Sequence, residues 1–276
     1  MVKRIEGLNV KFSVLMSLYN KELPSNLNDC LLSLTKQTTK ANEVVLVYDG
    51  PISDDLRNVV SKYVTLLNIN VHEIASNVGL GNALNFGLSK CKYELIARMD
   101  TDDICLTDRF EKQIDFLSKN PGVRLLGTSV IEFDEYGQER EKKLPVNPIK
   151  IKKFIKKRNP FNHMSVFFYK SDVIKVGCDK HHLYMEDYNL WIRLIHAGII
   201  ATNIEDNTVK VRVGREMIVR RKGKDYIASE FQLFKIKIKC DITGRLEGVS
   251  IFLLRSLIRV LPTRILSLIY DKDRRR

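Results

Sequence analysis

Short apolar runs alternate with longer amphipathic stretches over the first 120 residues of the chain. The apolar runs predict strands at 12–19, 42–50, 69–74 and 93–99, and the stretches between them predict helices at 24–37, 53–64 and 80–91. In the first of these helices, Leu27, Leu31 and Leu34 fall on one face. Strands that alternate with helices in this way build a mostly parallel sheet with helices on both faces, which indicates the α/β class.

Polar side chains stand at the ends of three predicted strands. Asn20, Asp49 and Asp100 each lie at a strand end or directly after it. Ligands of open α/β sheets bind beyond the carboxyl ends of the strands. We therefore expect these three side chains to converge on one crevice, although they are far apart in the sequence.

The rhythm of the pattern changes after residue 120. It predicts a strand at 123–133, a turn at 134–139, a strand at 163–170 and a helix at 185–198 that Gly198 ends. Two amphipathic, cation-rich helices are expected at 248–260 and 263–276, with Pro262 between them. Such helices can lie in an anionic membrane surface, or they can pack on the protein's own core or on a second subunit.

Charge is distributed unevenly along the chain. The formal net charge is +13, and residues 207–276 hold 18 Lys and Arg against 7 Asp and Glu, a net of +11. The run at 142–158 holds eight cations and no acidic residue. This balance indicates a polyanionic partner, which can be nucleic acid, an anionic lipid surface or a phosphorylated substrate. For the run at 142–158, a merely solubilising role is equally open.

The apolar runs and the cysteines indicate the compartment. No apolar run reaches the roughly 18 residues that a transmembrane helix needs. The short apolar stretch near the N-terminus has no small-residue cleavage site, which argues against a signal peptide. The five cysteines are scattered and form no CxxC pair, so they are typical of reduced thiols in a cytosolic protein.

Three carboxylates, Asp100, Asp102 and Asp103, follow the fourth predicted strand. Two carboxylates in an Asp-x-Asp spacing offer oxygen ligands to Mg²⁺, which fills its other positions with phosphate oxygens and water. Such a site suits a nucleotide diphosphate, whose charge the metal neutralises. Asp49 can accept hydrogen bonds from a nucleobase edge or a ribose hydroxyl. The alternatives are an acidic helix-capping loop for the first group and a turn residue for Asp49.

A second acidic pair, Glu186 and Asp187, opens the predicted helix at 185–198. Carboxylates at a helix N-terminus are stabilised by the backbone amides, so a structural role is one interpretation. In the functional interpretation, Asp187 stays ionised and takes a proton from a hydroxyl as a general base. Trp191 can stack on a sugar or belong to the core, and His163 can contact phosphate or metal or be structural.

Other chemistries lack their motifs in this chain. There is no Ser-His-Asp order, no Cys-His pair in a credible context, no GxxxxGK[ST] and no GxGxxG after a strand. A sugar nucleotidyltransferase would share the sheet and the acidic metal site, but it would need a basic Gly-rich loop where the chain has LYNKELPSN. A nucleic-acid-binding protein would interleave cations with aromatic residues. The C-terminal region interleaves them with aliphatic residues, which favours lipid.

Six separated motifs occur in an order that resembles family-two inverting glycosyltransferases of the GT-A fold. They are FSVLMSLYNKE, VVLVYDGP, NVGLGNALNFGL, YELIARMDTDDICLTDRFEKQIDFL, NHMSVFFYKSDV and MEDYNLWIRL. The resemblance covers about residues 10–225 and is closest to bacterial enzymes that assemble O-antigen, capsule or exopolysaccharide repeat units. It implies a catalytic domain at 1–225, with a nucleotide-sugar half at about 10–120 and an acceptor half at about 121–225, and a basic amphipathic helical tail at 226–276.

The resemblance also implies roles for individual residues. Asp49 would contact the uracil or ribose of a UDP-sugar, and Asp187, with Glu186 beside it, would deprotonate the acceptor hydroxyl. Asp100 and Asp102 would form the metal-binding pair, with Asp102 the more direct ligand. The other candidate contacts are Asp103 in support of the metal, Ser17, Tyr19 and Asn20 in the nucleotide pocket, Arg98, Arg220 and Arg221 at the diphosphate, and Trp191 and His163 at a sugar. The loop at Tyr48–Pro51 departs from the Asp-Gly-Ser of many relatives but keeps the Asp.

The implied reaction moves a hexose from a UDP-sugar, with UDP-galactose or UDP-glucose favoured, to a sugar on a polyprenyl diphosphate. One in-line displacement, with Mn²⁺ or Mg²⁺ and a single base, would invert an α-linked donor to a β-glycoside. Residues 246–276 would hold a cytoplasmic protein peripherally at the anionic inner face of the plasma membrane. No nucleic-acid partner is expected. The pattern does not specify the transferred sugar, the acceptor sugar or the oligomeric state.

Overall fold

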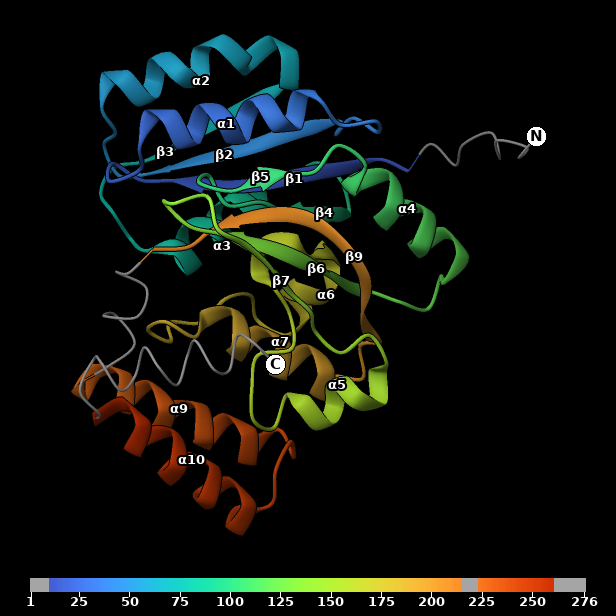
Figure 1. Cartoon of the computed structure of the whole chain (residues 1–276), viewed down its shortest axis with the longest axis vertical. Coiled ribbons are helices and arrows are strands. Elements are labelled where there is room, and N and C mark those ends of the chain that lie inside the picture. Colours follow the sequence, from blue (N-terminus) through green and yellow to red (C-terminus); the bar gives the residue numbers. More distant parts are fainter. Residues whose placement is uncertain (1–9, 215–222, 261–276) are drawn as a thin grey trace.

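The structure, a computed structural model, describes residues 10–214 and 223–260 (Figure 1). Its central sheet has the strand order β3-β2-β1-β4-β8-β6-β9-β5, and β7 pairs with β6. Helices cover both faces of the sheet, and α9 and α10 lie side by side at one end of the molecule (Figure 1). The α/β architecture that the sequence predicts is therefore confirmed.

The first half of the sheet is parallel. Its strands are β1 (Phe12–Leu18), β2 (Glu43–Asp49), β3 (Ile69–Ile74) and β4 (Leu95–Arg98). β1 pairs in parallel with β2 and β4, and β2 pairs in parallel with β3. Every residue of β1, β2 and β4 is buried, as expected for strands that are covered on both faces. The carboxyl ends of these strands meet at one edge, so the residues that we expected to converge do lie along that edge.

Two hydrophobic clusters cover the two faces of this parallel half. The helices that form them are α1 (Pro24–Thr35), α2 (Asp54–Leu67) and α3 (Leu80–Lys90). α1 and α2 pack on one face, against side chains such as Val14 and Leu46. α3 packs on the opposite face, against Leu15 and Val45. The alternation of neighbouring residues between the two clusters is the period of two that a strand imposes.

Strand directions are mixed in the second half of the sheet. Its strands are β5 (Ile104–Cys105), β6 (Leu125–Phe133), β7 (Glu139–Lys142), β8 (Phe167–Tyr169) and β9 (Ala201–Arg212). β8 runs antiparallel to β4 and β6, whereas β9 runs parallel to β6. The sequence pattern did not predict β5, β7 or β9. β9 is hard to recognise because its central residues are polar and a register shift interrupts its pairing with β6.

The remaining elements are helices that follow β5 in the chain. They are α4 (Arg109–Lys119), α5 (Pro148–Phe154), the 3₁₀ turn η1 (His163–Ser165), α6 (Lys170–Lys175), α7 (Glu186–His196), α9 (Lys224–Lys239) and α10 (Arg245–Val260). The strand predicted at 163–170 is shorter than expected, because its first three residues form η1.

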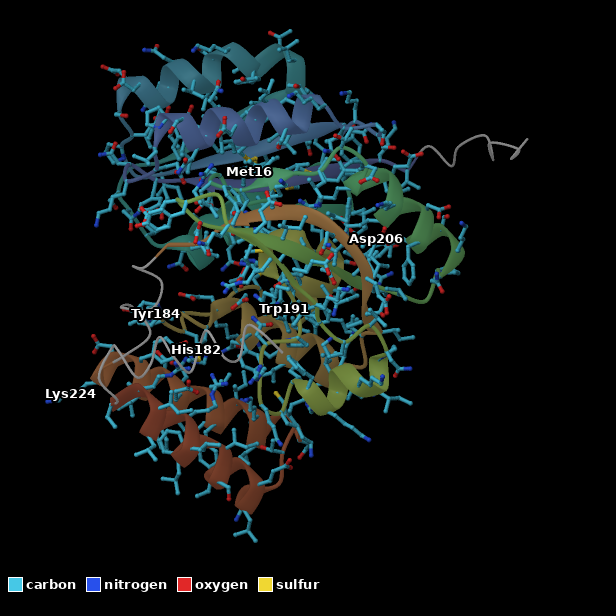
Figure 2. The ribbon with its side chains drawn as sticks, viewed as in Figure 1. Met16, His182, Tyr184, Trp191, Asp206 and Lys224 are labelled. Atoms are coloured by element: carbon cyan, nitrogen blue, oxygen red, sulfur yellow. The ribbon has the colours of Figure 1, made fainter. Side chains whose placement is uncertain are left out.

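The side chains of helix α9 pack it against the rest of the fold. Tyr226 and Leu233 belong to the same hydrophobic cluster as α3 and α7. His182 and Tyr184, in the loop before α7, lie over α9 (Figure 2). The Nε2 of His182 is 2.8 Å from the carbonyl oxygen of Ser229, and the Tyr184 ring stacks on Tyr226 at 5.4 Å between centroids. The first helix of the predicted tail thus packs on the domain, and the boundary after residue 225 stays a prediction.

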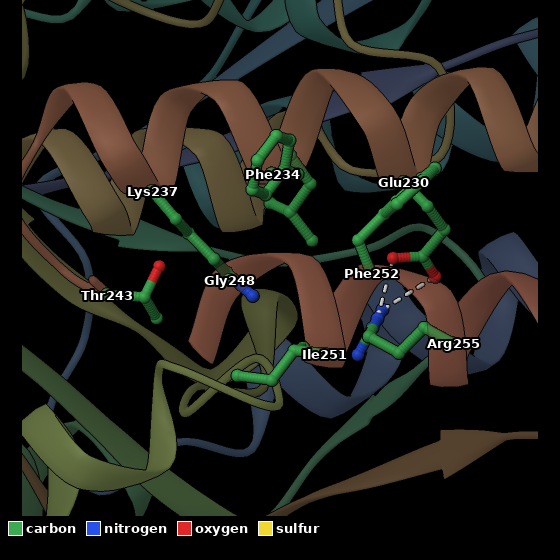
Figure 3. A pocket seen from close by; sticks show the side chains of 9 residues that line it. Glu230, Phe234, Lys237, Thr243, Gly248, Ile251, Phe252 and Arg255 are labelled. Carbon is green, nitrogen blue, oxygen red and sulfur yellow. Dashed lines mark hydrogen bonds and ion pairs between the residues drawn. The ribbon is translucent and has the colours of Figure 1, made fainter. Parts of the chain in front are cut away.

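A buried ion cluster joins α9 to α10. Glu230 accepts two hydrogen bonds from Arg255, at 2.6 and 2.9 Å, and one from Arg259 at 3.3 Å. Figure 3 shows the pair of Glu230 and Arg255 beside a small cavity between the helices, which Phe234 and Lys237 also line. The sequence placed Arg255 and Arg259 on a cationic face of an amphipathic helix. In the structure both arginines turn inward to Glu230, and the exposed residues of α10 are mainly aliphatic.

The described residues contain no helix that is both long enough and apolar enough to cross a membrane. The five cysteines are all free thiols, and four of them are buried. Burial raises the pKa of the Cys105 thiol to about 11, so this group is an inert core residue at neutral pH.

Candidate active site

Two buried arginines, Arg98 and Arg109, hold the end of β4 through hydrogen bonds. Arg98 is 1% exposed, and its guanidinium donates to the carbonyl oxygen of Leu15 at 3.3 Å and to the carboxylate of Asp100. Arg109 in turn donates to the carbonyl oxygen of Arg98 at 2.7 Å. Two guanidinium nitrogens of Arg98 bind the protein and fix Asp100 at the sheet edge, whereas the buried Nε has no partner among the described residues. The contact of Arg98 with a diphosphate stays a prediction.

Asp102 sits in a concentration of negative charge. Burial, followed by the charges of Asp100 and Glu22, raises the pKa of Asp102 to about 7. Glu22 comes from the loop between β1 and α1, and its Oε2 accepts a hydrogen bond from Thr101 at 3.0 Å. Sequence reasoning missed Glu22, because it lies far from the acidic motif along the chain. Carboxylates crowded in this way favour the approach of a cation.

Asp103 is tied to the neighbouring strand β9 by its side chain. It is 2% exposed, and its Oδ1 accepts a hydrogen bond from the backbone N–H of Arg212 at 2.9 Å. Burial and the neighbouring Asp102 raise the pKa of Asp103. We predicted that Asp103 would be a metal ligand or support one. Its Oδ1 anchors the acidic loop to β9, its Oδ2 is buried without a partner among the described residues, and its support of a metal stays a prediction.

The remaining carboxylates fit a divalent cation that arrives with phosphate. No cluster of three or more His, Cys, Asp or Glu side chains suited to a metal occurs within residues 10–214 and 223–260. Asp100 and Asp102 still form the kind of pair that Mg²⁺ or Mn²⁺ accepts when phosphate oxygens and water supply the other ligands. The crowded charge at Asp102 is what such a cation would neutralise.

Asp49 holds the loop in front of α3. Its carboxylate accepts hydrogen bonds from the backbone N–H groups of Val78, at 2.7 Å, and Gly79, at 3.1 Å, and from the side chain of Asn77 at 3.0 Å. The next residue, Gly50, has a φ of 87°, and a Cβ there would lie 2.8 Å from the backbone nitrogen of Asn77. Only glycine allows this close approach. A contact of Asp49 with uridine stays a prediction.

The end of β1 completes the nucleotide side of the edge. Ser17 is 9% exposed, whereas Tyr19 and Asn20 are exposed directly beyond the strand. These positions agree with a backbone that lines a pocket, and the contacts themselves stay predictions. Arg220 and Arg221 lie outside the described residues.

Asp187 is oriented by a residue that the sequence reasoning missed. The side-chain amide of Asn159 donates to the Oδ2 of Asp187 at 2.6 Å, and the backbone N–H of Tyr188 donates to the Oδ1 at 2.7 Å. The amide oxygen of Asn159 is itself held by the N–H of Phe161 at 3.2 Å. Asp187 is partly exposed and its geometry is fixed, as a general base requires. Burial raises the pKa of the adjacent Glu186.

His163 and Trp191 pack on each other. Burial and the charge of Arg98 lower the pKa of His163, and the charges of Asp187 and Asp100 act in the opposite direction. Trp191 is fully buried and packs edge-on against His163, with 5.9 Å between ring centroids. We expected Trp191 to contact a sugar or to belong to the core, and because its ring has no exposed face it belongs to the core. The sugar contact of His163 stays a prediction.

Replacing Asn159 with Ala should lower kcat by roughly 10- to 100-fold, the range seen when a group that orients a reacting residue is lost. The amide of Asn159 fixes the Oδ2 of Asp187, and alanine leaves that oxygen free to turn. Steady-state kinetics would measure kcat and the KM for the donor separately. Asn120→Ala, which removes an exposed amide on the far end of α4, is the control. A change confined to KM would contradict an orienting role.

Known proteins share extensive sequence with this chain. A family model described as glycosyl transferase family 2 matches residues 13–178. The amylovoran biosynthesis glycosyltransferase AmsE of Erwinia amylovora is 49% identical over 96% of this chain and 99% of its own length. An Escherichia coli UDP-Gal:alpha-D-GlcNAc-diphosphoundecaprenol beta-1,3-galactosyltransferase is 36% identical over 96% of this chain and 97% of its own.

A solved structure shares the fold. The crystal structure of Staphylococcus aureus TarS 1–349 in complex with UDP-GlcNAc superposes on this chain with a TM-score of 0.69. The two sequences are 18% identical, and the match covers 91% of this chain and 72% of that one. The chain spans 43% of the longer TarS structure. The family model covers more than half of the chain, and two relatives match it almost from end to end. The protein is therefore a member of glycosyl transferase family 2.

Proposed function

We propose that the protein transfers a hexose from a UDP-sugar to a sugar on a polyprenyl-diphosphate acceptor, with inversion, during the assembly of a bacterial surface polysaccharide. Family membership and relatives named for amylovoran and O-antigen synthesis support glycosyl transfer in polysaccharide biosynthesis. The name of the E. coli relative gives it a UDP-galactose donor and a diphosphoundecaprenol-linked acceptor. TarS was crystallised with UDP-GlcNAc.

One observation carries the proposal. The segment around η1 touches both acidic sites. The N–H of Arg98, at the end of β4, donates to the carbonyl oxygen of Val166, directly after η1, at 2.9 Å. His163 of η1 packs against Trp191 of α7 at 5.9 Å between ring centroids. The carboxylates suited to a nucleotide diphosphate and the carboxylate suited to a base therefore border the same small region. No second carboxylate is needed as a nucleophile for inversion, because the acceptor oxygen itself attacks the sugar.

The proposed step is a single displacement. The acceptor hydroxyl oxygen bonds to the anomeric carbon, the bond from that carbon to the diphosphate oxygen breaks, and the hydroxyl proton passes to Asp187. Asn159 holds the accepting carboxylate in place. A divalent cation at Asp100 and Asp102 would supply positive charge to the leaving UDP. Because attack comes from the side opposite the leaving group, an α-linked donor gives a β-glycoside.

A donor screen tests this proposal most directly. We expect UDP release from UDP-galactose or UDP-glucose, in the presence of Mn²⁺ and a polyprenyl-diphosphate sugar, to exceed release from the other UDP-sugars. Chelation with EDTA should abolish most of the release. Equal, acceptor-independent release from every donor would contradict the proposal. Transfer of a nucleotidyl group would show that the protein is a nucleotidyltransferase instead.

The outward face of α10 supports a peripheral position at the membrane. Six aliphatic side chains on this face are between 42% and 86% exposed, and they are Leu246, Val249, Leu253, Leu254, Leu257 and Val260. A stripe of this kind marks an interaction site on an otherwise polar protein. An acceptor with a polyprenyl chain lies in a membrane, so we propose that lipid covers the stripe. Residues 261–276, the second part of the predicted membrane segment, lie outside the described residues.

Charges placed in this stripe should release the protein from lipid. We expect the double variant Leu253→Glu/Leu257→Glu to lose most of its binding to anionic vesicles in a sedimentation assay, because insertion would bury two carboxylates. Leu66→Glu, at a 72% exposed leucine of α2 at the other end of the molecule (Figure 1), is the matched control. Unchanged sedimentation of the double variant would show that the stripe meets another partner.

A further inference from the structure

We propose that Asp179 binds a hydroxyl group of the transferred sugar and thereby helps to select the donor, an inference that rests on the proposed glycosyl transfer. Asp179 lies in the loop between α6 and α7, and no motif in the sequence drew attention to it. Its place in the fold, the state of its carboxylate and the way its backbone is held each support this role.

Asp179 borders the path between the nucleotide side and the base. Gly81, in the first turn of α3, follows closely on Gly79, whose N–H binds Asp49. A Cβ added at Gly81 would lie 3.4 Å from the Cβ of Asp179 and 3.4 Å from the Cγ of Glu186. One short wall thus runs from the loop of Asp49, past Gly81 and Asp179, to the start of α7. A UDP-sugar that reaches from the sheet edge to the base passes along this wall.

The carboxylate of Asp179 lacks a protein partner on one side. Its Oδ1 is buried and accepts no hydrogen bond from any residue that the structure describes. Burial, followed by the charge of Asp187, raises the pKa of Asp179 to about 7. A buried carboxylate oxygen without a donor costs stability unless a bound group donates to it. A sugar hydroxyl is the donor that the proposed substrate would bring.

The loop around Asp179 is fixed without help from the carboxylate. The side chain of Asn85, one turn after Gly81, donates to the carbonyl oxygen of Asp179 at 2.8 Å and accepts from its N–H at 2.8 Å. Arg193 of α7 donates to the carbonyl oxygens of Val176, at 2.5 Å, and Cys178, at 2.6 Å. A structural aspartate would use its oxygens to hold the loop. Here the side chains of Asn85 and Arg193 hold the loop by its backbone, and the carboxylate of Asp179 is left preorganised for a ligand.

Kinetics with modified donors test the proposal. We expect Asp179→Asn to lower kcat/KM for the preferred UDP-hexose by about 10- to 100-fold, the cost of losing one hydrogen bond to a charged group. In a series of UDP-hexoses that each lack one hydroxyl, one member should show almost the same kcat/KM for the variant and the wild type. The affinity for UDP alone should not change. Equal losses with every donor, or weaker binding of UDP, would overturn the proposal.

The wild type separates this inference from the proposed function. If the wild-type protein turns over no UDP-hexose, the proposed function fails, whatever the variants do. If it turns over a UDP-hexose and Asp179→Asn matches it with all donors, only the role of Asp179 fails. Thermal unfolding of Asp179→Asn shows whether the variant is folded, and Asn85→Ala provides the contrast of a variant that releases the loop itself.

A second variant probes the wall from α3. Gly81→Ala should preserve or raise the unfolding temperature, because alanine is the better helix former. Its methyl group would stand in the space between Asp179 and Glu186, so we expect the KM for the donor sugar to rise several-fold while UDP binds as before. A variant that is more stable and equally active with every donor would show that no sugar uses this space.

Discussion

Replacing Asp187 with Asn should lower kcat by roughly 10³-fold, the order expected when a general base is removed. The substitution keeps the size of the side chain but removes the charge that accepts the proton. Both carboxylate oxygens are held, one by Asn159 and one by the N–H of Tyr188, so the side chain is already in position when the acceptor binds. UDP affinity should be unchanged, because the proposed role of Asp187 is to act on the acceptor.

The measurement is single-turnover kinetics together with calorimetric titration of UDP. Asp115→Asn, which removes an exposed carboxylate paired only with Lys119 on α4, is the matched control. If Asp187→Asn kept full turnover, the base would have to be another group, with Glu186 the nearest alternative. A loss of UDP binding would instead show that the start of α7 contributes to the nucleotide pocket.

The parallel half of the fold was predictable because each element there has a strong local signal. β1, β2 and β4 are continuous apolar runs, and α2 begins at a Ser53 cap and carries Asp54 and Asp55 in its first turn. The second half depends on long-range pairing. The polar strand β7 and the two-residue strand β5 are stable only because β6 and β9 lie beside them. Nothing in their own sequences distinguishes them from loops.

The acidic positions of the site were predictable, but the separate role of each carboxylate was not. The pattern placed Asp100, Asp102 and Asp103 together, and only packing shows that Asp103 turns inward to the backbone of Arg212. The supporting residues were missed for the same reason. Glu22, Asn159 and Asp179 lie in loops, and each contacts a partner that is distant in sequence.

Replacing Asp102 with Asn should abolish the stimulation of UDP binding by Mn²⁺ or Mg²⁺ and lower turnover by two to three orders of magnitude, an effect of the size seen when charge stabilisation of a leaving group is lost. Of the three carboxylates after β4, Asp102 is the one that no other described residue holds by a hydrogen bond. Arg98 holds Asp100, and Arg212 holds Asp103. Titration of UDP with and without metal would measure the difference.

The Asp102→Asn variant should not lose stability, which distinguishes a ligand-binding residue from one that supports the fold. Burial and the charges of Asp100 and Glu22 raise the pKa of Asp102 to about 7, so the ionised side chain opposes folding as the pH rises from about 4 toward 7. Asparagine removes that repulsion, and we expect an equal or higher unfolding temperature at neutral pH. Asp103→Asn, by contrast, alters a buried anchor. If Asp102→Asn still responded to Mn²⁺ like the wild type, the metal would have to bind elsewhere.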